Sequence, residues 1–394
     1  MTNPRMRAAV LGAAGLATTM MIVSACSQGA ADDSDGAETV GLIEVQGDSE
    51  LALDDYNNGA LLAVDDINRD GGVLGKDLKY TRIPASVVDP QDARAAFLKA
   101  TDRDPAAIFG FPGGGSLEAL TREVDGAGIP MIHLSSDGKL AYGAEGGSKW
   151  LFSVNPDDVY RAVGGVQQAK ALGAKKIGII ATDETFGRVS TENSLDAIEE
   201  AGLELGPVRY VSPTSTDLTS AVLDMKDVDA VLSWTFPNIL ALQLQQMQQN
   251  DLAVPVITGN SGPLVVANEL AKGPAVDNLY AVTPCEPAIG ESETGRRFAA
   301  EYEKEYGVPP TASATQVYDA QRILAAAVEE AGSTDPGDVL SALEEMEYSD
   351  GACASVYKSD GAHFLGHQYV VIDYAAGSKP KIVETVDVPE ADGS

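Results

Sequence analysis

Along most of the chain, short apolar runs alternate with longer segments in which apolar residues recur at helical spacing. In residues 57–68, for example, Ala60, Leu61, Val64 and Ile67 fall on one face of a helix. Short runs rich in Val and Ile, bounded by turn residues, are typical of buried strands. This alternation predicts parallel sheets with helices on both faces, and the number of units fits an α/β protein with two doubly wound domains.

The pattern gives approximate bounds for each element. Strands are predicted at residues 40–45, 78–83, 106–111, 130–134, 176–181, 208–211, 229–234, 254–258, 278–284 and 368–372. Helices are predicted at residues 57–68, 90–101, 116–127, 159–172, 190–201, 219–225, 239–250, 295–306 and 314–331.

Residues 1–25 have the order of a signal peptide: a basic start with Arg5 and Arg7, an uncharged apolar run, and small residues before Cys26. The run is about 16 residues long, which is short for a bilayer core of ~30 Å. The sequence Val-Ser-Ala-Cys that ends at Cys26 resembles the bacterial lipobox, whose cysteine is lipidated. This resemblance implies a protein anchored at the outer face of the cell membrane. Residues 26–38 are predicted to be a flexible tether because they lack large apolar side chains.

The chain has a formal net charge of −32, with 27 basic and 59 acidic residues. Without the two arginines of the signal segment the charge is −34. Such acidity disfavours nucleic acid and anionic lipid surfaces as partners. Acidic pairs in or beside predicted helices, such as Asp54-Asp55, Asp65-Asp66 and Asp157-Asp158, are expected to lie on solvated faces.

Two cysteines, Cys285 and Cys353, remain after Cys26. In an exported chain two such thiols favour a disulfide, although two free thiols stay an alternative. His363 and His367 lie in a segment with the pattern of a hairpin, where a spacing of four leaves them ~13 Å apart, so no metal site is predicted. No cofactor is expected, because the glycines at 113–115 are not followed by the lysine of a phosphate-binding loop.

Several stretches, in this order, resemble the type I periplasmic-binding superfamily, and most closely the substrate-binding lipoproteins of branched-chain amino-acid ABC transporters. The most specific stretch runs from Asn58-Gly59-Ala60 to Gly71-Gly72-Val73-Leu74-Gly75. The others are Asp89-Pro90-Gln91, Gly128-Ile129-Pro130, Leu172-Gly173-Ala174 and Tyr318-Asp319-Ala320.

The resemblance implies two lobes that face each other across a cleft and are joined by three crossovers. Lobe one would comprise residues 39–155 and 284–365, and lobe two residues 156–283 and 366–388, before a tail at 389–394. The resemblance also implies a monomer that closes on a small ligand and delivers it to an ABC transporter permease. The ligand would be a branched-chain amino acid, an amide, a urea or an aromatic acid.

Ligands of open parallel sheets bind beyond the carboxyl ends of the strands, and this rule together with the resemblance selects the candidate ligand-binding residues. They are Gly113, Gly114, Ser116, Ser135, Ser136, Asp137, Phe186, Trp234, Phe236 and Asn260. The glycines offer backbone N–H groups to a carboxylate or amide oxygen, and the aromatic residues offer apolar walls. Asn260 stands where the resembling amino-acid binders have an acid, so it favours a ligand that lacks a charged ammonium group. Asp137 or Asp183 is an alternative partner for such a charge.

Two other classes of function are weighed against the importer. A lipid-anchored hydrolase is disfavoured because no Gly-x-Ser-x-Gly motif is present and only three histidines exist. A sensor for a membrane receptor would share the fold and the cleft, and the sequence does not separate it from an importer. No catalytic residue is predicted in either case.

Replacement of Cys26 by Ser should release the protein from membranes, because acyl chains on this one residue would supply the retention. Fractionation of cells that express the wild type and the variant measures this. A Cys26→Ser protein that stays with the membranes after a salt wash would show that the lipobox interpretation is wrong.

Overall fold

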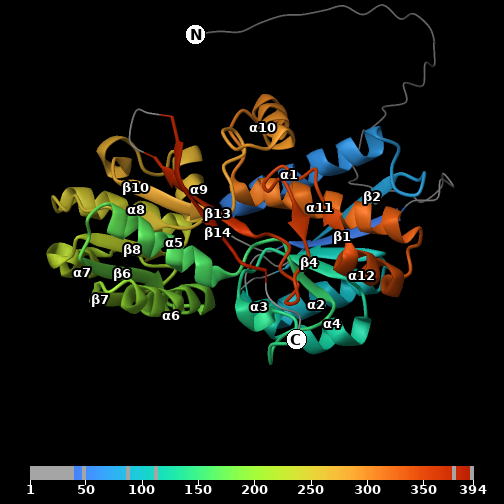
Figure 1. Ribbon diagram of the computed structural model, residues 1–394, viewed down its shortest axis with the longest axis horizontal. Helices are drawn as coiled ribbons and strands as arrows, with labels where there is room; N and C mark the ends of the chain where they lie inside the picture. Colours follow the sequence, from blue (N-terminus) through green and yellow to red (C-terminus); the bar gives the residue numbers. More distant parts are fainter. Residues whose placement is uncertain (1–39, 47–49, 86–88, 111–113, 375–378, 391–394) are drawn as a thin grey trace, which may run out of the picture. The chain divides into compact units, whose positions relative to one another are not determined.

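The computed structural model describes residues 40–46, 50–85, 89–110, 114–374 and 379–390. Its strands form two large sheets that are covered by helices, together with one short pair of strands (Figure 1). The predicted α/β class with two parallel-strand-rich sheets is confirmed. We call the first sheet with its covering helices lobe one and the second sheet with its helices lobe two.

The first sheet has five parallel strands in the order β2-β1-β3-β4-β5. The strands are β1 (Val40–Gln46), β2 (Leu78–Pro84), β3 (Ala107–Gly110), β4 (Met131–His133) and β5 (Leu151–Ser153). Its helices are α1 (Glu50–Arg69), α2 (Pro90–Thr101), α3 (Gly114–Glu118), α4 (Thr121–Ala127), η1 (Gly138–Leu140), α10 (Glu293–Tyr306), α11 (Ala312–Ala331) and α12 (Pro336–Glu345). The short strands β11 (Glu347–Tyr348) and β12 (Tyr357–Lys358) pair antiparallel beside them.

The second sheet has seven strands in the order β14-β13-β10-β9-β8-β6-β7. They are β6 (Lys176–Thr182), β7 (Glu204–Val211), β8 (Ala230–Trp234), β9 (Val256–Thr258), β10 (Leu279–Thr283), β13 (Gln368–Asp373) and β14 (Lys381–Asp387). Its helices are α5 (Asp158–Ala171), α6 (Thr185–Glu200), α7 (Thr219–Asp224), η2 (Met225–Asp227), α8 (Pro237–Gln249), α9 (Ser261–Ala267) and η3 (Gly273–Val276). Strand β13 pairs antiparallel with both of its neighbours, β10 and β14, so this sheet is not wholly parallel.

Most predicted elements are present, with three kinds of difference. Helix α1 begins at Glu50, seven positions before its predicted start. The single helix predicted at 116–127 is divided into α3 and α4, with Leu120 between them. The elements that were not predicted include β5 and α9, which are short, and β14, in which polar and apolar residues alternate at an edge of the sheet. They also include α12, which begins after its N-cap Asp335, and the short elements η1, η3, β11 and β12.

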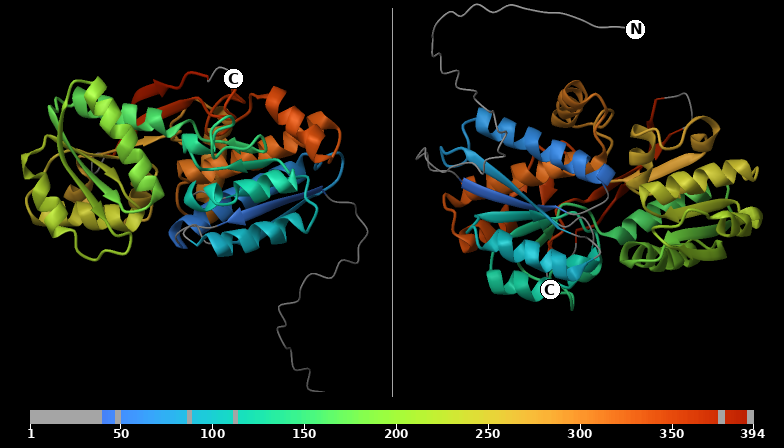
Figure 2. Two further views of the ribbon diagram at one scale, coloured as in Figure 1. Left: turned by 90° about the horizontal axis from the view of Figure 1, so that it is seen from below. Right: turned by 180° about the vertical axis from the view of Figure 1, so that it is seen from behind.

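Helices α1 and α11 lie side by side (Figures 1 and 2), and their contact needs a glycine. A Cβ atom on Gly59 would lie 2.2 Å from the carbonyl oxygen of Ala314, so any side chain there would push the helices apart. Two carboxylates are buried in the same region. Asp55 accepts a hydrogen bond from Tyr302 (2.9 Å), and Asp66 accepts one from Tyr318 (2.6 Å).

The expectation that the acidic pairs lie on solvated faces is therefore wrong for one member of each pair. Asp55, Asp66 and Asp158 are 8%, 5% and 3% exposed. Each finds hydroxyl or guanidinium donors from a distant part of the chain or from the same helix. The tyrosine donors of Asp55 and Asp66 are not shown by a sequence pattern, because they come from elements far apart along the chain.

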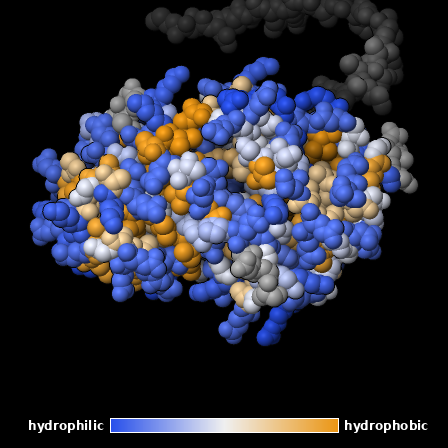
Figure 3. Space-filling model, viewed as in Figure 1, coloured by the Kyte–Doolittle hydropathy of each residue, from blue (hydrophilic) through white to orange (hydrophobic). Residues whose placement is uncertain are grey.

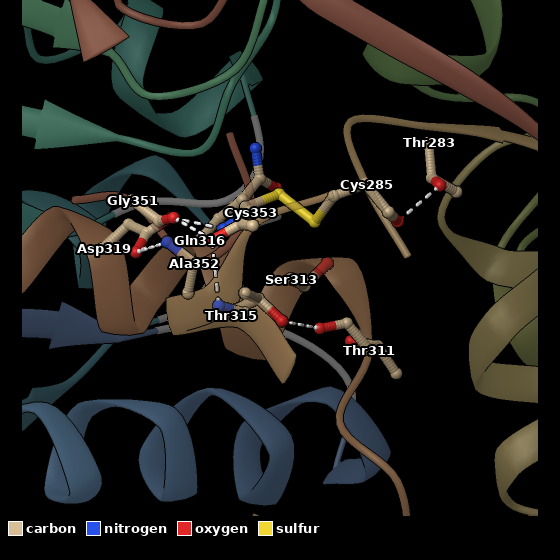
Figure 4. Close-up of a disulfide and its surroundings, with 12 residues drawn as sticks. Thr283, Cys285, Thr311, Ser313, Thr315, Gln316, Asp319, Gly351, Ala352 and Cys353 are labelled. Atoms are coloured by element: carbon tan, nitrogen blue, oxygen red, sulfur yellow. Dashed lines mark hydrogen bonds between the residues drawn. A yellow bond between two sulfur atoms is a disulfide. The ribbon is translucent and has the colours of Figure 1, made fainter. Parts of the chain in front are cut away.

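A disulfide joins Cys285, which follows β10, to Cys353 (Figure 4). The segment around Cys353 is held by Asp319 of α11, whose carboxylate accepts the backbone N–H groups of Ala352 and Cys353, both at 2.7 Å. The Tyr357 hydroxyl donates to the same carboxylate at 2.8 Å. The disulfide thus ties the chain that leaves lobe two to a buried anchor of lobe one.

The chain passes between the lobes three times: after β5, after β10 and before β13. The first and third passages are hydrogen-bonded to each other. The Ser153 N–H donates to the His363 carbonyl (2.9 Å), and the Leu365 N–H donates to the Ser153 carbonyl (2.8 Å). The number of crossovers agrees with the resemblance.

Hydrophilic side chains cover most of the face of the molecule shown in Figure 3. None of the helices in the described part of the chain combines the length and the apolar character needed to cross a membrane.

Folding stability should fall as the pH rises from 5 to 8. Burial raises the pKa of Asp319 to about 7 and that of Asp55 to about 6, so the folded state retains protons that the unfolded state releases near pH 4. This stabilisation is complete at a pH below the pKa that each carboxyl group has in the unfolded state. It is lost as the pH rises through the pKa that the same group has in the folded state. These two groups should contribute a loss on the order of 2–4 kcal/mol to the free energy of unfolding. The buried His133, whose pKa is lowered to about 3, opposes part of this loss. Urea denaturation at each pH measures the net change.

An Asp319→Asn variant is the control, because Asp319 has the higher pKa of the two carboxyl groups and the variant removes its titration. It should be less stable than the wild type at pH 5, since three donors face a side chain that now carries an NH₂ group. Its stability should also depend less on pH. A variant with the full pH dependence of the wild type would contradict the assignment to Asp319.

Candidate functional site

The candidate site is built from loops that follow the carboxyl ends of parallel strands in both sheets. In lobe one, α3 follows β3 in the chain, and a loop leads from β4 to η1. In lobe two, loops lead from β6 to α6, from β8 to α8 and from β9 to α9. The carboxyl ends of neighbouring parallel strands share one edge of a sheet, which brings each set of loops together.

The lobe-one loops carry buried hydroxyl groups. Ser116 in α3 is 1% exposed, and Ser135 and Ser136 after β4 are also buried. The next residue, Asp137, caps η1 by accepting the N–H of Lys139 at 3.0 Å. Gly114 is the first residue of α3. The predicted residue Gly113 lies outside the described residues.

A buried ion pair in lobe two connects directly to these serines. Asp158, the first residue of α5, pairs with Arg161 at 2.7 Å, and the two residues are 3% and 4% exposed. Arg161 Nη2 donates to Ser136 Oγ at 3.0 Å, and the Asp158 N–H donates to the Ser136 carbonyl at 2.9 Å. Ser190 of α6 donates to the other Asp158 oxygen at 2.8 Å. Hydrogen bonds thus join the two lobes at the loop after β4.

The sequence analysis missed both Asp158 and Arg161 as residues of the site. The position of Asp158 directly after the N-cap Asp157 made it look like an ordinary acidic residue in a first helical turn. The available signal was Arg161 at position i+3, a spacing at which an acid and a base face each other on a helix.

Burial sets the protonation of several groups around this loop. It lowers the pKa of His133, at the end of β4, to about 3, so the imidazole is neutral. Burial also raises the pKa of Asp137, and it raises that of Asp157 to about 6, helped by the neighbouring charges of Asp158 and Asp137. The cation buried beside this loop, Arg161, is already paired with Asp158.

The three aromatic residues predicted to line the cleft differ in burial. Trp234 is fully buried in the core of lobe two, where its indole N–H donates to Ser194 Oγ at 2.9 Å, so it is a core residue rather than a wall of a cleft. Phe186, in the first turn of α6, packs against the same core and is half-buried. Phe236, the N-cap residue of α8, is also half-buried.

The two alternative acids differ in their surroundings. Asp183 is exposed and forms an ion pair with Arg188, so it is not a partner for a buried charge. Asp137 is buried and lies beside the serines. Asn260, the N-cap residue of α9, donates from Nδ2 to Ser313 Oγ of α11 at 3.4 Å, and its buried Oδ1 has no hydrogen-bond partner in the described structure.

No group of three His, Cys, Asp or Glu side chains in the described residues is arranged to hold a metal ion. His363 instead stacks on the ring of Phe152, with 4.1 Å between ring centroids, and on that of Tyr142. Its Nδ1 lies 3.2 Å from the Leu151 carbonyl oxygen. This histidine therefore has a packing role beside the first and third crossovers.

Comparison with known proteins identifies the family. The family model described as "Periplasmic binding protein" matches residues 39–379. A Leu/Ile/Val-binding protein homolog 8 from Brucella melitensis biotype 1 is 25% identical over 334 residues, which cover 80% of this chain and 82% of that protein.

Two solved structures share the fold. A leucine-binding protein from Thermotoga maritima superposes with a TM-score of 0.77 at 19% identity, covering 89% of this chain and 98% of that chain. A solute-binding protein of an ABC transporter from R. palustris, in complex with benzoate, superposes with a TM-score of 0.78 at 18% identity, covering 91% and 99%.

Replacement of Trp234 by Ala should lower the free energy of unfolding by about 3–5 kcal/mol, because it opens a cavity in the core of lobe two. Chemical denaturation of the purified variant measures this. Phe236→Ala is the matched control and should cost less, since that ring is only half-buried. Equal losses for the two variants would contradict the core role of Trp234.

Proposed function

Because the chain belongs to the periplasmic binding protein family, we propose that it captures a small organic ligand between its two lobes and delivers it to the permease of an ABC importer. The protein acts by binding and release, and it has no enzymatic activity. The proposal also includes its place: a monomer anchored through lipidated Cys26 at the outer face of the membrane, with residues 26–38 as the tether.

The observation that carries this proposal is the polar network between the lobes. Ser136 of lobe one contacts both Asp158 and Arg161 of lobe two, and all three are buried. The network lies where the loops at the carboxyl ends of the strands converge, which is the usual position of a ligand in open α/β sheets. Polar groups from both lobes can therefore contact one ligand at the same time.

The range of ligands follows from the site and from the relatives. Similar proteins include Leu/Ile/Val-binding protein homologs and substrate-binding proteins solved in complex with isoleucine and with benzoate. Buried hydroxyls such as Ser116 and Ser135, together with the half-buried rings of Phe186 and Phe236, suit a ligand with one polar and one apolar end. We therefore propose a branched-chain amino acid, an amide, a urea or an aromatic acid.

A saturating ligand should bring the lobes together and raise the melting temperature, because it contacts both lobes only when they are closed. At a ligand concentration 100 times Kd, binding adds about 2.7 kcal/mol to the free energy of unfolding. Small-angle scattering and thermal denaturation, with and without the ligand, measure the two effects.

The Ser136→Ala variant tests the polar contact between the lobes, because it removes the hydroxyl to which Arg161 donates. It should weaken binding while leaving the fold intact. Scattering curves that a saturating and independently verified ligand leaves unchanged would count against closure of the lobes, and turnover of the ligand would contradict the binding role.

A further inference from the structure

Three buried polar atoms near the contacts between the lobes have no hydrogen-bond partner in the described structure: Arg161 Nε, Asn260 Oδ1 and Gln316 Oε1. Buried polar groups are almost always paired, because an unpaired one costs its full desolvation energy. Arg161 and Gln316 are at least nine-tenths buried as whole residues. The three atoms are therefore candidates for hydrogen bonds to a ligand.

The residues that carry these atoms are linked to one another. A Cβ atom on Gly259, the neighbour of Asn260, would lie 3.3 Å from Arg161 Cδ and 3.8 Å from Arg161 Nε. On its other side, Asn260 contacts Ser313 of α11. Ser313 and Gln316 are three residues apart on α11 and so share a face of that helix (Figure 4).

The direction of each free hydrogen bond follows from the bonds already made. Asn155 donates from Nδ2 to the Leu134 carbonyl, so its Oδ1 must accept, and Gln316 Nε2 donates to it at 2.6 Å. This leaves Gln316 Oε1 as an acceptor. Asn260 Nδ2 is turned to Ser313, which leaves Asn260 Oδ1 as a second acceptor. Arg161 Nε carries a hydrogen and is a donor.

From this pattern, and resting on the proposed function, we infer that the ligand ends in an uncharged primary carboxamide or ureide group. Its carbonyl oxygen accepts from Arg161, and its NH₂ group donates to Asn260 and Gln316. A primary amide offers two N–H donors and one strong acceptor, which matches the three free atoms.

The competing ligand classes match this pattern less well. A carboxylate offers only acceptors and would face the two amide oxygens of Asn260 and Gln316 without a hydrogen to share. An ammonium group offers donors, but neither amide supplies a counter-charge, and the Asp158 carboxylate is already taken by Arg161, Ser136 and Ser190. The other acid, Asp137, is buried beside the serines, and burial raises its pKa, which disfavours its charged form. A buried ammonium without an opposite charge is costly.

Calorimetric titration of the full protein with matched probes tests the inference: isovaleramide against isovalerate, benzamide against benzoate, and leucine. We expect at least one amide to bind ten times or more tightly than its acid and than leucine. Asn260→Leu removes the acceptor oxygen and should weaken the amide at least tenfold. Asn260→Asp should strengthen leucine, because an acid now faces the ammonium group. Arg161→Lys keeps a charge beside Asp158 but lacks the Nε donor, and it should also weaken the amide about tenfold.

Asn278→Asp is the matched control, since it adds the same charge at an exposed position before β10 and should leave every affinity unchanged. Tighter binding of the acids or of leucine by the wild type, or an Asn260→Leu variant with wild-type amide affinity, would overturn the inference and leave the proposed function standing. Absence of binding and of lobe closure with every probe, and with a wider panel of amino acids and aromatic acids, would overturn the proposed function itself.

Discussion

The buried ion pair between Asp158 and Arg161 is the interaction on which the contact between the lobes depends. A buried pair is stable only when further hydrogen bonds satisfy both partners, because each ion has lost its water. Asp158 meets this requirement through Ser190 of its own lobe and Ser136 of the other. Removal of either ion would leave the other unpaired, at a cost of about 3–5 kcal/mol. The same requirement explains why hydroxyl side chains gather around this pair.

The sequence predicted the fold well because the fold follows from local patterns. The helical spacing in α2 and α11 and the apolar runs of β6 and β8 identify these elements without knowledge of their neighbours. The short strand β5 was missed, since three residues carry no period.

The site was predicted less well, because it depends on contacts between distant segments. Ser136 and Asn260 were selected from their positions after strands, and the structure places both beside contacts between the lobes. Trp234 also follows this rule, but its ring points into the core of lobe two. Neither the direction of a side chain at a strand end nor the pairing of Arg161 with Ser136 can be read from spacing alone.

The connections between the lobes limit how the protein can open. The first and third crossovers are hydrogen-bonded through Ser153, and the second is tied to lobe one by the disulfide at Cys285. In the first crossover Asn155 is held by Gln316 of lobe one, and the next carbonyl, that of Pro156, accepts the Tyr369 hydroxyl of lobe two at 2.8 Å. Arg161 lies less than two helical turns beyond this connection, in α5. A ligand that bonds to both Gln316 and Arg161 therefore acts beside the connection between the lobes, where it can favour one angle between them over another.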